Sequence, residues 1–321
     1  MRVIVFGAGA IGGVIGGRLA QSGHDVVLIA RGAHHDAIRA DGLRLEDPDR
    51  TVTVSVPVVD GPAAITFGED DVVVLAVKSQ DSPDALRALA ASASSTTPVV
   101  CAQNGVANER LALRSFANVH AMCVMCPATH LAPGIVQAHS APTSGILDLG
   151  LYPGGVDHTS EDLAAVLRAS TFSAKARTDI MKWKHRKLLS NLGNAIDAAC
   201  GPGARGTDVA ARARAEAEAC LQVAGIEATS EADDRARRGE LLSVRSIGSQ
   251  RRGGSSSWQS LERGTGSIEA DYLNGEIVLL GRLHGVPTPV NATLQRIANQ
   301  MARERTAPGS LAVEDLVAAV S

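Results

Sequence analysis

The first half of the chain alternates between short apolar stretches and stretches of helical periodicity. The apolar stretches are residues 2–6, 24–31, 51–59, 70–78 and 97–105, followed by two more at 120–130 and 145–153. Residues 51–59 alternate apolar and polar side chains, whereas 70–78 are continuously apolar, as in the middle of a parallel sheet. Helical patterns at 13–23, 82–92 and 108–116 separate these strands. The alternation predicts an α/β domain with a doubly wound sheet of the Rossmann type.

Beyond about residue 177 the strand signal disappears and helical patterns follow one another. The predicted helices are 179–199, 207–224, 230–247, 258–284 and 290–303, with Gly/Ser-rich breaks at 201–206 and 250–257. A chain of 321 residues is too long for one ordinary core. We therefore predict a nucleotide-binding domain over residues 1–177 and an all-helical domain over 178–321. A cleft between two such domains is where small molecules commonly bind.

The first predicted strand leads directly into a glycine-rich turn and a helix. The turn is Gly7-Ala8-Gly9-Ala10-Ile11-Gly12, and "HDVVLIAR" (24–31) forms the next strand. In this strand–turn–helix–strand context G-x-G-x-x-G is a dinucleotide-binding fingerprint. Its first glycine permits the tight turn, the second lets the backbone approach a pyrophosphate, and the third lets the helix pack on the strand. The alternative is a Gly-rich turn with a structural role alone.

The residue that ends the second strand indicates which dinucleotide binds. NAD sites place Asp or Glu there to accept a hydrogen bond from the ribose 2′-hydroxyl. This chain has Arg31, a guanidinium that suits a 2′-phosphate and cannot accept a hydrogen bond. The sequence therefore favours NADPH, unless Arg31 is only a solvated turn residue. His34 and His35, which follow closely, are expected on a surface loop.

Two polar residues stand where predicted strands end. Lys78 closes "VVVLAVK" and Asn104 closes "VVCAQN". Ligands of open α/β sheets bind outside the carboxyl ends of the strands. Both residues are therefore candidates for the site, although Lys and Asn at strand ends also serve as ordinary turn or surface residues.

The first predicted helix of the second half begins with a dense group of cations, "KWKHRK" (182–187). At helical spacing one polar stripe runs along this helix through Lys184, Lys187, Asn191 and Asn194, while the rest of the helix beyond Lys187 is apolar nearly all round. Asparagine is a poor helix former, so two of them aligned below a lysine favour a polar cleft. Lys182, His185 and Arg186 lie off the stripe and are assigned to solvent or to phosphate.

Composition excludes several classes of function. A net charge of −3 gives no electrostatic footprint for nucleic acid, and no apolar run is long enough to cross a membrane. The N-terminus shows no signal peptide, and five cysteines fit a reducing compartment, so a cytoplasmic protein is expected. Cys123 and Cys126 are read as strand residues in preference to a redox or zinc pair. No histidine spacing indicates a metal site.

Taken together, these segments resemble the ketopantoate reductase (2-dehydropantoate 2-reductase) family. The resemblance covers nearly the whole chain and rests on "GAGAIGG" (7–13), "AVKSQD" (76–81), "QNGVANE" (103–109), "WKHRKLLSN" (183–191), residues 255–281 and "HGVPTPVN" (284–291). It implies a fold like that of 6-phosphogluconate dehydrogenase and NADPH-dependent reduction of a 2-keto acid to a 2-hydroxy acid. The leading substrate is ketopantoate, in pantothenate biosynthesis.

The resemblance also implies roles for individual residues. Lys187 matches the lysine that acts as general acid, Asn104 the asparagine of the N-G motif, Lys78 the lysine after the apolar strand, and Glu269 the family's glutamate. Ser257 matches the substrate-binding serine, and Asn191 and Asn194 complete the substrate side. An ammonium within reach of the carbonyl oxygen stabilises the charge that develops there and supplies the proton. Glu269 would orient Lys187, Lys78 or a substrate hydroxyl, and Asn104 would bind that oxygen or the nicotinamide carboxamide.

Some positions depart from the family pattern. The spacing from Trp183 to Lys187 is longer than in the family, and Ala195 stands where a second asparagine is usual, with Asn194 one position earlier. Ser260 replaces a common aspartate. These departures leave open a reductase that acts on another keto acid, carbonyl or imine, and a non-catalytic NADPH-sensing protein. The sequence is compatible with a homodimer but does not determine the oligomeric state.

Overall fold

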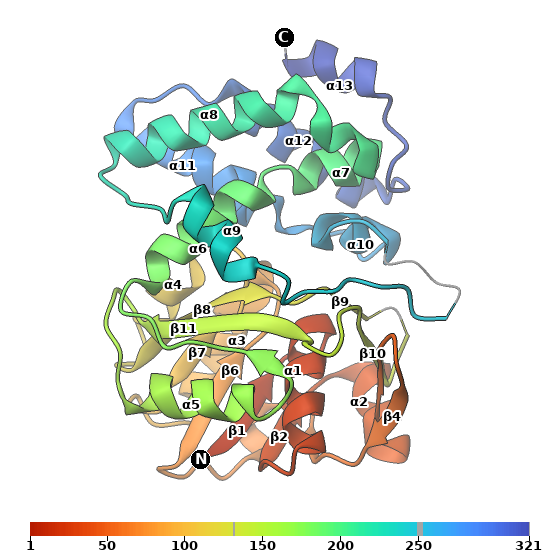
Figure 1. Cartoon of the computed structure of the whole chain (residues 1–321), viewed down its shortest axis with the longest axis vertical. Helices are drawn as coiled ribbons and strands as arrows, with labels where there is room; N and C mark the ends of the chain where they lie inside the picture. The colour runs from red at the N-terminus through yellow and green to blue at the C-terminus, as the bar shows by residue number, and fades with distance from the viewer. Residues whose placement is uncertain (131, 249–252, 321) are drawn as a thin grey trace. The chain divides into compact units, whose positions relative to one another are not determined.

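The computed structural model describes residues 1–130, 132–248 and 253–320 (Figure 1). Contacts divide these residues into two compact units. The first comprises residues 1–103, 108–184 and 231–248, and the second comprises 104–107, 185–230 and 253–320. The chain passes between the units several times, so neither unit is one continuous stretch. The domain boundary expected after residue 177 stays a prediction.

The first unit is built on a mostly parallel sheet that has the predicted doubly wound order. Its strands lie in the order β12-β11-β8-β7-β6-β1-β2-β5. They span Phe172–Ser173, Gly145–Leu151, Val119–Met125, Val99–Cys101, Asp71–Leu75, Arg2–Phe6, Val26–Ile29 and Val58–Val59. The order β5-β2-β1-β6-β7-β8 is that of a dinucleotide-binding domain, and it reverses between β1 and β6. β11 pairs antiparallel to β8 at one side.

Alternate residues of β1 enter two separate hydrophobic cores, as a strand covered on both faces requires. Val3 and Val5 belong to a core that also contains side chains of α1 (Ala10–Gln21) and, beside β11, of α5 (His158–Arg168). Ile4 and Phe6 pack on the other face with α3 (Ser82–Ala90) and with Ala112 of α4 (Asn108–Ala112). Helix α2 (Gly32–Asp41) and the short 3₁₀ turns η1 (Pro62–Ala64) and η2 (Ser79–Asp81) complete the connections.

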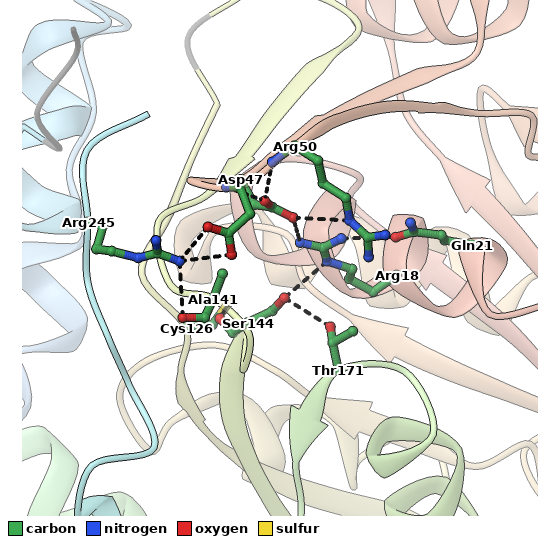
Figure 2. Close-up of polar contacts among 10 residues, drawn as sticks. Arg18, Gln21, Asp47, Arg50, Cys126, Ala141, Ser144, Thr171 and Arg245 are labelled. Atoms are coloured by element: carbon green, nitrogen blue, oxygen red, sulfur yellow. Dashed lines mark hydrogen bonds and ion pairs between the residues drawn. The ribbon is translucent and has the colours of Figure 1, made fainter. Parts of the chain in front are cut away.

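A smaller sheet lies beside the end of α1 and is tied to it by a buried ion pair. Its order is β4-β3-β10-β9, over Thr51–Val54, Leu43–Glu46, Ile135–Ala138 and Ala128–Thr129. Arg18 Nη2 lies 2.5 Å from Asp47 Oδ2, and Arg18 Nε donates to Ser144 Oγ at 3.0 Å (Figure 2). Burial alone would raise the pKa of Asp47, but hydrogen bonds from Arg18 and from two backbone N–H groups bring that pKa below its ordinary value.

In the described residues of the second unit the regular elements are all helices. Its helices are the later part of α6 (Ile180–Asn191), α7 (Asn194–Cys200), α8 (Asp208–Val223), α10 (Ser256–Glu262), α11 (Asn274–His284), α12 (Pro289–Glu304) and α13 (Val313–Val320), with the 3₁₀ turns η3 (Pro202–Gly206) and η4 (Glu269–Tyr272). Two apolar cores hold them together. The carboxylate of Glu216 caps α12 by accepting from Val290 N at 2.8 Å and Asn291 N at 3.0 Å.

The helix predicted over 179–199 is two helices, because the chain turns at Leu192 and Gly193. Asn274 Nδ2 donates to the carbonyl oxygen of Leu192 at 3.2 Å, so a side chain occupies an acceptor that a continuous helix would use itself. Glycine at 193 lowers the helix propensity further. Asn194 therefore begins a new helix and does not continue the predicted stripe.

Other predicted elements are also interrupted at identifiable residues. The helix predicted over 230–247 is only α9 (Glu231–Arg238), because Gly239 takes φ +42° and Arg245 N then bonds to His139 O in the first unit. The helix predicted over 258–284 is broken after α10 by Gly264 and Gly266, both at positive φ. The strand predicted over 51–59 splits into β4 and β5 on either side of Pro57. Residues 250–252 of the predicted Gly/Ser-rich break lie outside the described residues.

Candidate functional site

The predicted glycine turn follows β1 at the point where the strand order reverses. Gly7 has φ +105°, and a Cβ at this residue would lie 2.7 Å from Val77 N in the segment after β6. Glycine is thus required at this position for two reasons. The backbone of Val77 leaves no room for a Cβ, and residues with a side chain rarely adopt a positive φ. The turn and the end of β6 lie against each other within the first unit.

The remaining two glycines of the motif differ in what surrounds them. A Cβ at Gly12 would lie 2.1 Å from Gly7 O and 2.9 Å from Val5 Cγ1, so this glycine allows α1 to pack on β1. At Gly9, in contrast, an added Cβ would meet nothing within 4 Å. The side of Gly9 where a Cβ would stand therefore faces open space, which suits the approach of a phosphate group to the N-terminus of α1. This turn fits a dinucleotide.

Arg31 lies at the start of α2, directly after β2, and is exposed. The expectation that His34 and His35 lie on a surface loop is wrong, because both residues are in α2 and half-buried; His34 makes the informative contacts. Its Nδ1 accepts from Gly134 N at 2.9 Å, so its Nε2 donates to Ala8 O at 2.7 Å. Burial, and then the neighbouring His130, lower the pKa of His34. His34 thus holds the carbonyl of the glycine turn.

Lys78 and Asn104 follow neighbouring parallel strands of the first unit's sheet. Leu75 at the end of β6 pairs with Cys101 at the end of β7. Lys78 precedes η2, and its carbonyl oxygen lies 3.4 Å from Ser82 Oγ. Asn104 begins a short loop whose residues 104–107 group with the second unit. Gly105 in this loop has φ +81°, and a Cβ there would lie 2.7 Å from Tyr272 O, in the turn η4 that begins with Glu269.

Lys184 is buried, although the sequence placed it on the polar stripe with Lys187. Its side chain is 3% exposed and forms an ion pair with Glu109, which is fully buried. Its Nζ also donates to Gln103 O at 3.1 Å. Burial raises the pKa of the nearby Cys101 thiol well above its ordinary value, and the charge of Glu109 adds to this. The stripe therefore contains one lysine of structural character and one, Lys187, that remains a candidate for chemistry.

In the second unit, α6 presents Lys187 and Asn191 one turn apart. Lys187 is half-buried and Asn191 is 6% exposed. Asn191 Nδ2 has no hydrogen-bond acceptor among the described residues. Asn194 is already engaged, because its Oδ1 accepts from Arg205 Nη2 at 2.6 Å. Arg186 was assigned to solvent or phosphate; instead its Nε donates to Thr229 O at 2.5 Å.

Ser257 and Glu269 are both buried within the second unit. Ser257 lies in the first turn of α10, whose N-cap is Ser255. Ser255 N donates to Asp197 Oδ2 at 2.5 Å, and Ser255 Oγ lies 3.3 Å from Asn194 O, so the starts of α7 and α10 are joined. Sequence reasoning missed Asp197 and Glu109. A lone carboxylate in the apolar stretch 195–200 was the available signal for Asp197.

Cys123 and Cys126 lie near the end of β8, and each has its own backbone partner. Cys123 lies in β8 with its Sγ 3.7 Å from Trp183 O, and Cys126 Sγ lies 3.4 Å from Ser144 O. Among the described residues no group of His, Cys, Asp or Glu could hold a metal ion. None of the helices in the described part of the chain has both the length and the apolar character needed to cross a bilayer.

Comparison with known proteins adds the family to this geometry. Residues 3–154 match the family described as "Ketopantoate reductase PanE/ApbA", and residues 179–302 match "Ketopantoate reductase PanE/ApbA C terminal". A 2-dehydropantoate 2-reductase of Halobacterium salinarum is 30% identical over 322 residues, which cover 95% of this chain and 100% of that protein.

Solved structures share the fold across nearly the whole chain. A PanE/ApbA family ketopantoate reductase from Ralstonia eutropha JMP134 is 28% identical with a TM-score of 0.80, covering 95% of this chain and 99% of that one. D-mandelate dehydrogenase, solved with NADH and anilino(oxo)acetate, has a TM-score of 0.79 at 24% identity, covering 96% and 100%. The chain therefore belongs to the ketopantoate reductase family, whose members are oxidoreductases that use a nicotinamide cofactor.

Proposed function

We propose that this protein is an NADPH-dependent reductase that converts a 2-keto acid to a 2-hydroxy acid, with ketopantoate as the leading substrate and Lys187 as the general acid. The observation that carries the proposal is the pair Lys187 and Asn191 on α6. These residues are four positions apart and so lie on one face of the helix. Asn191 is buried with Nδ2 unmatched by any described acceptor, and a substrate oxygen would satisfy that donor.

The first unit would bind the cofactor through the glycine turn and Arg31. The open space at Gly9 and the free N–H groups at the start of α1 suit a pyrophosphate, and the exposed guanidinium of Arg31 suits a 2′-phosphate. Bound NADPH supplies a hydride to the carbonyl carbon of the substrate. Lys78 and Asn104, at the ends of neighbouring strands, would bind the cofactor or the substrate there.

The second unit would supply the proton and hold the substrate. Lys187 would donate to the carbonyl oxygen as negative charge develops on it, which contributes about 10²–10⁴-fold to the rate in enzymes of this kind. Asn191 and Ser257 are neutral donors that suit a carboxylate or a hydroxyl. Glu269 would orient Lys187, Lys78 or a substrate hydroxyl. Asn194 is retained as a substrate residue only if Arg205 releases its side chain.

The family leaves the keto acid open. Ketopantoate is favoured by the relatives named 2-dehydropantoate 2-reductase, which match nearly the full chain. The fold itself also occurs in a D-mandelate dehydrogenase, a 2-hydroxy acid enzyme with an aromatic side chain on its substrate. Ala195 and Ser260 depart from the family pattern on the substrate side. An aryl 2-keto acid therefore belongs in the substrate panel.

The test follows NADPH oxidation with ketopantoate, phenylglyoxylate and a series of aliphatic 2-keto acids. Lys187→Ala is expected to lower kcat by about 10²–10⁴-fold while NADPH binding, measured by fluorescence, is retained. Lys187→Arg is the matched control: it keeps the positive charge but is a very weak acid, so it should bind substrate yet turn over slowly. If none of the keto acids supports oxidation of NADPH or NADH, the proposal is overturned.

A further inference from the structure

The buried ion pair of Lys184 and Glu109 is not explained by the proposed chemistry. Both side chains are almost completely removed from solvent, at 3% and 0% exposure. Glu109 Oε2 has no donor among the described residues, so Lys184 supplies the compensating charge for this carboxylate. A buried ion pair is weak evidence for stability, because desolvation of both charges offsets much of their attraction. The role of the pair is therefore better inferred from the segments that it joins.

A single ammonium contacts both ends of one loop. Lys184 Nζ donates to Gln103 O, the residue directly before Asn104, and pairs with Glu109 in the first turn of α4, directly after Asn108. The intervening residues 104–108 include Gly105 at φ +81°. Gln103 Nε2 and Asn108 Nδ2 also donate, to Ser82 Oγ at 3.4 Å and Ser79 Oγ at 3.0 Å. Both ends of the loop that carries Asn104 are thus fixed.

The part of α6 that carries Lys184 packs on the sheet of the first unit. Ile180 and Trp183, in the same part of α6, pack on Ala121 and Cys123 of β8. The guanidinium of Arg177 lies 3.7 Å from the centre of the Trp183 ring. Lys184 follows directly, and Lys187 lies three residues further along the same helix. The clamp and the proposed general acid therefore share one element.

We propose that the Lys184–Glu109 pair is a positioning device that fixes the Asn104 loop in register with helix α6, and so with Lys187. Neither residue of the pair touches substrate or cofactor in this proposal. The proposal rests on the function proposed above, because it assigns the pair to alignment of two groups of that reaction. Misplacement of a reacting group by about 1 Å can lower a rate by about 10²-fold, so alignment is where loss of the pair would be felt.

The decisive variant is the double substitution Lys184→Met/Glu109→Leu. It removes both charges together and fills their volume, a change that is often neutral or stabilising for buried ion pairs. It also removes the hydrogen bond to Gln103 O. We expect the melting temperature to stay close to that of the wild type and NADPH binding to stay within about threefold, while kcat falls by about 10- to 100-fold. Hydrogen exchange of the amides of residues 104–108 should rise.

The matched control is Arg18→Met/Asp47→Leu. This pair is equally buried and belongs to the same unit, but its contacts are with Gln21, Ser144 and the β3–β4 turn (Figure 2). It should show the same small change in melting temperature with kcat within about threefold of the wild type. A fall in kcat of equal size in both double variants would mean that any lost buried pair impairs the enzyme, and the positioning role would be overturned.

Two further results separate the proposals from each other. If the folded Lys184→Met/Glu109→Leu variant keeps wild-type kcat and wild-type exchange in residues 104–108, the clamp is wrong whatever the substrate. If the wild type reduces no keto acid, the proposed function is wrong, and exchange in that loop still decides whether the pair holds it. The single variant Glu109→Gln keeps the shape of the side chain and should retain more of kcat than the double variant does.

Discussion

The glycine turn after β1 and the polar face of α6 are both predicted to bind ligand, but they are built by different means. The turn would bind ligand through its backbone, and its glycines allow this because they have no Cβ. At Gly9 an added Cβ would face open space. The polar face of α6 would bind ligand through side chains, and the role of each side chain depends on the residues that it contacts. Lys184 is taken by Glu109, whereas Asn191 Nδ2 is unmatched among described residues.

This difference determines what a mutation can reveal in each region. In the turn, a substitution lowers stability only where the added Cβ would lie close to other atoms. Gly12 is such a position and Gly9 is not, so a variant at Gly12 tests stability and a variant at Gly9 tests binding. Asn191 at the end of α6 and Asn194 at the start of α7 are residues of the same type, but Asn194 is bound by Arg205 whereas Asn191 Nδ2 has no acceptor among the described residues, so comparing the two asparagines separates structure from function.

The largest effect is expected from Gly12→Ala. Its Cβ would lie 2.1 Å from Gly7 O, between β1 and α1, so either the helix or the turn must move. We expect the free energy of unfolding to fall by about 3 kcal/mol, as for severe overpacking. Gly9→Ala is the control, with nothing within 4 Å, and should leave stability within about 0.5 kcal/mol while weakening NADPH binding. Chemical denaturation and fluorescence titration measure the two quantities. Equal loss of stability in both variants would contradict this account of the turn.

A smaller effect is expected from Asn191→Ala, and it should fall on catalysis. Removal of one hydrogen-bond donor to a charged substrate group should lower kcat/KM for the keto acid by about tenfold or more, with little change in melting temperature. Asn194→Ala loses the bond from Arg205 and should mainly lower the free energy of unfolding, by about 1 kcal/mol. Steady-state kinetics and thermal unfolding of both variants decide. The reverse assignment of the two effects would restore Asn194 to the substrate side.

The same contrast explains how much the sequence could predict. The order of the main sheet and the glycine turn follow from local rules, because strand period, glycine spacing and the right-handed crossover act over a few residues. The break at Gly193 could not be predicted, since it depends on Asn274, which lies about eighty residues away and bonds to Leu192 O. The ion pair of Lys184 joins residues 75 positions apart. Periodicity placed Lys184 on the correct helix but gave no information about its partner.

Arg31→Ala tests the cofactor side with a more moderate effect. Loss of the guanidinium should weaken NADPH binding by about tenfold and leave NADH binding almost unchanged, because only NADPH carries the 2′-phosphate. Arg39→Ala is the control, an exposed arginine in the same helix α2. Titration of both variants with both cofactors gives the four affinities. If Arg31→Ala weakens NADH as much as NADPH, the preference for NADPH loses its basis in this residue.

The smallest effect concerns the pH dependence of stability at the glycine turn. Burial and His130 hold the pKa of His34 below its ordinary value of about 6.5, so the unfolded chain binds a proton more readily than the folded one. His34 therefore contributes stability that is present above about pH 6.5 and is lost as the pH falls through the lowered folded value. Glutamine can still accept from Gly134 N and donate to Ala8 O, so His34→Gln should match the wild type at pH 8 and lose less stability at pH 5.5. Denaturation at both pH values measures this, with exposed His284→Gln as control. A variant whose stability falls with pH as steeply as the wild type would show that His34 does not couple protonation to the glycine turn.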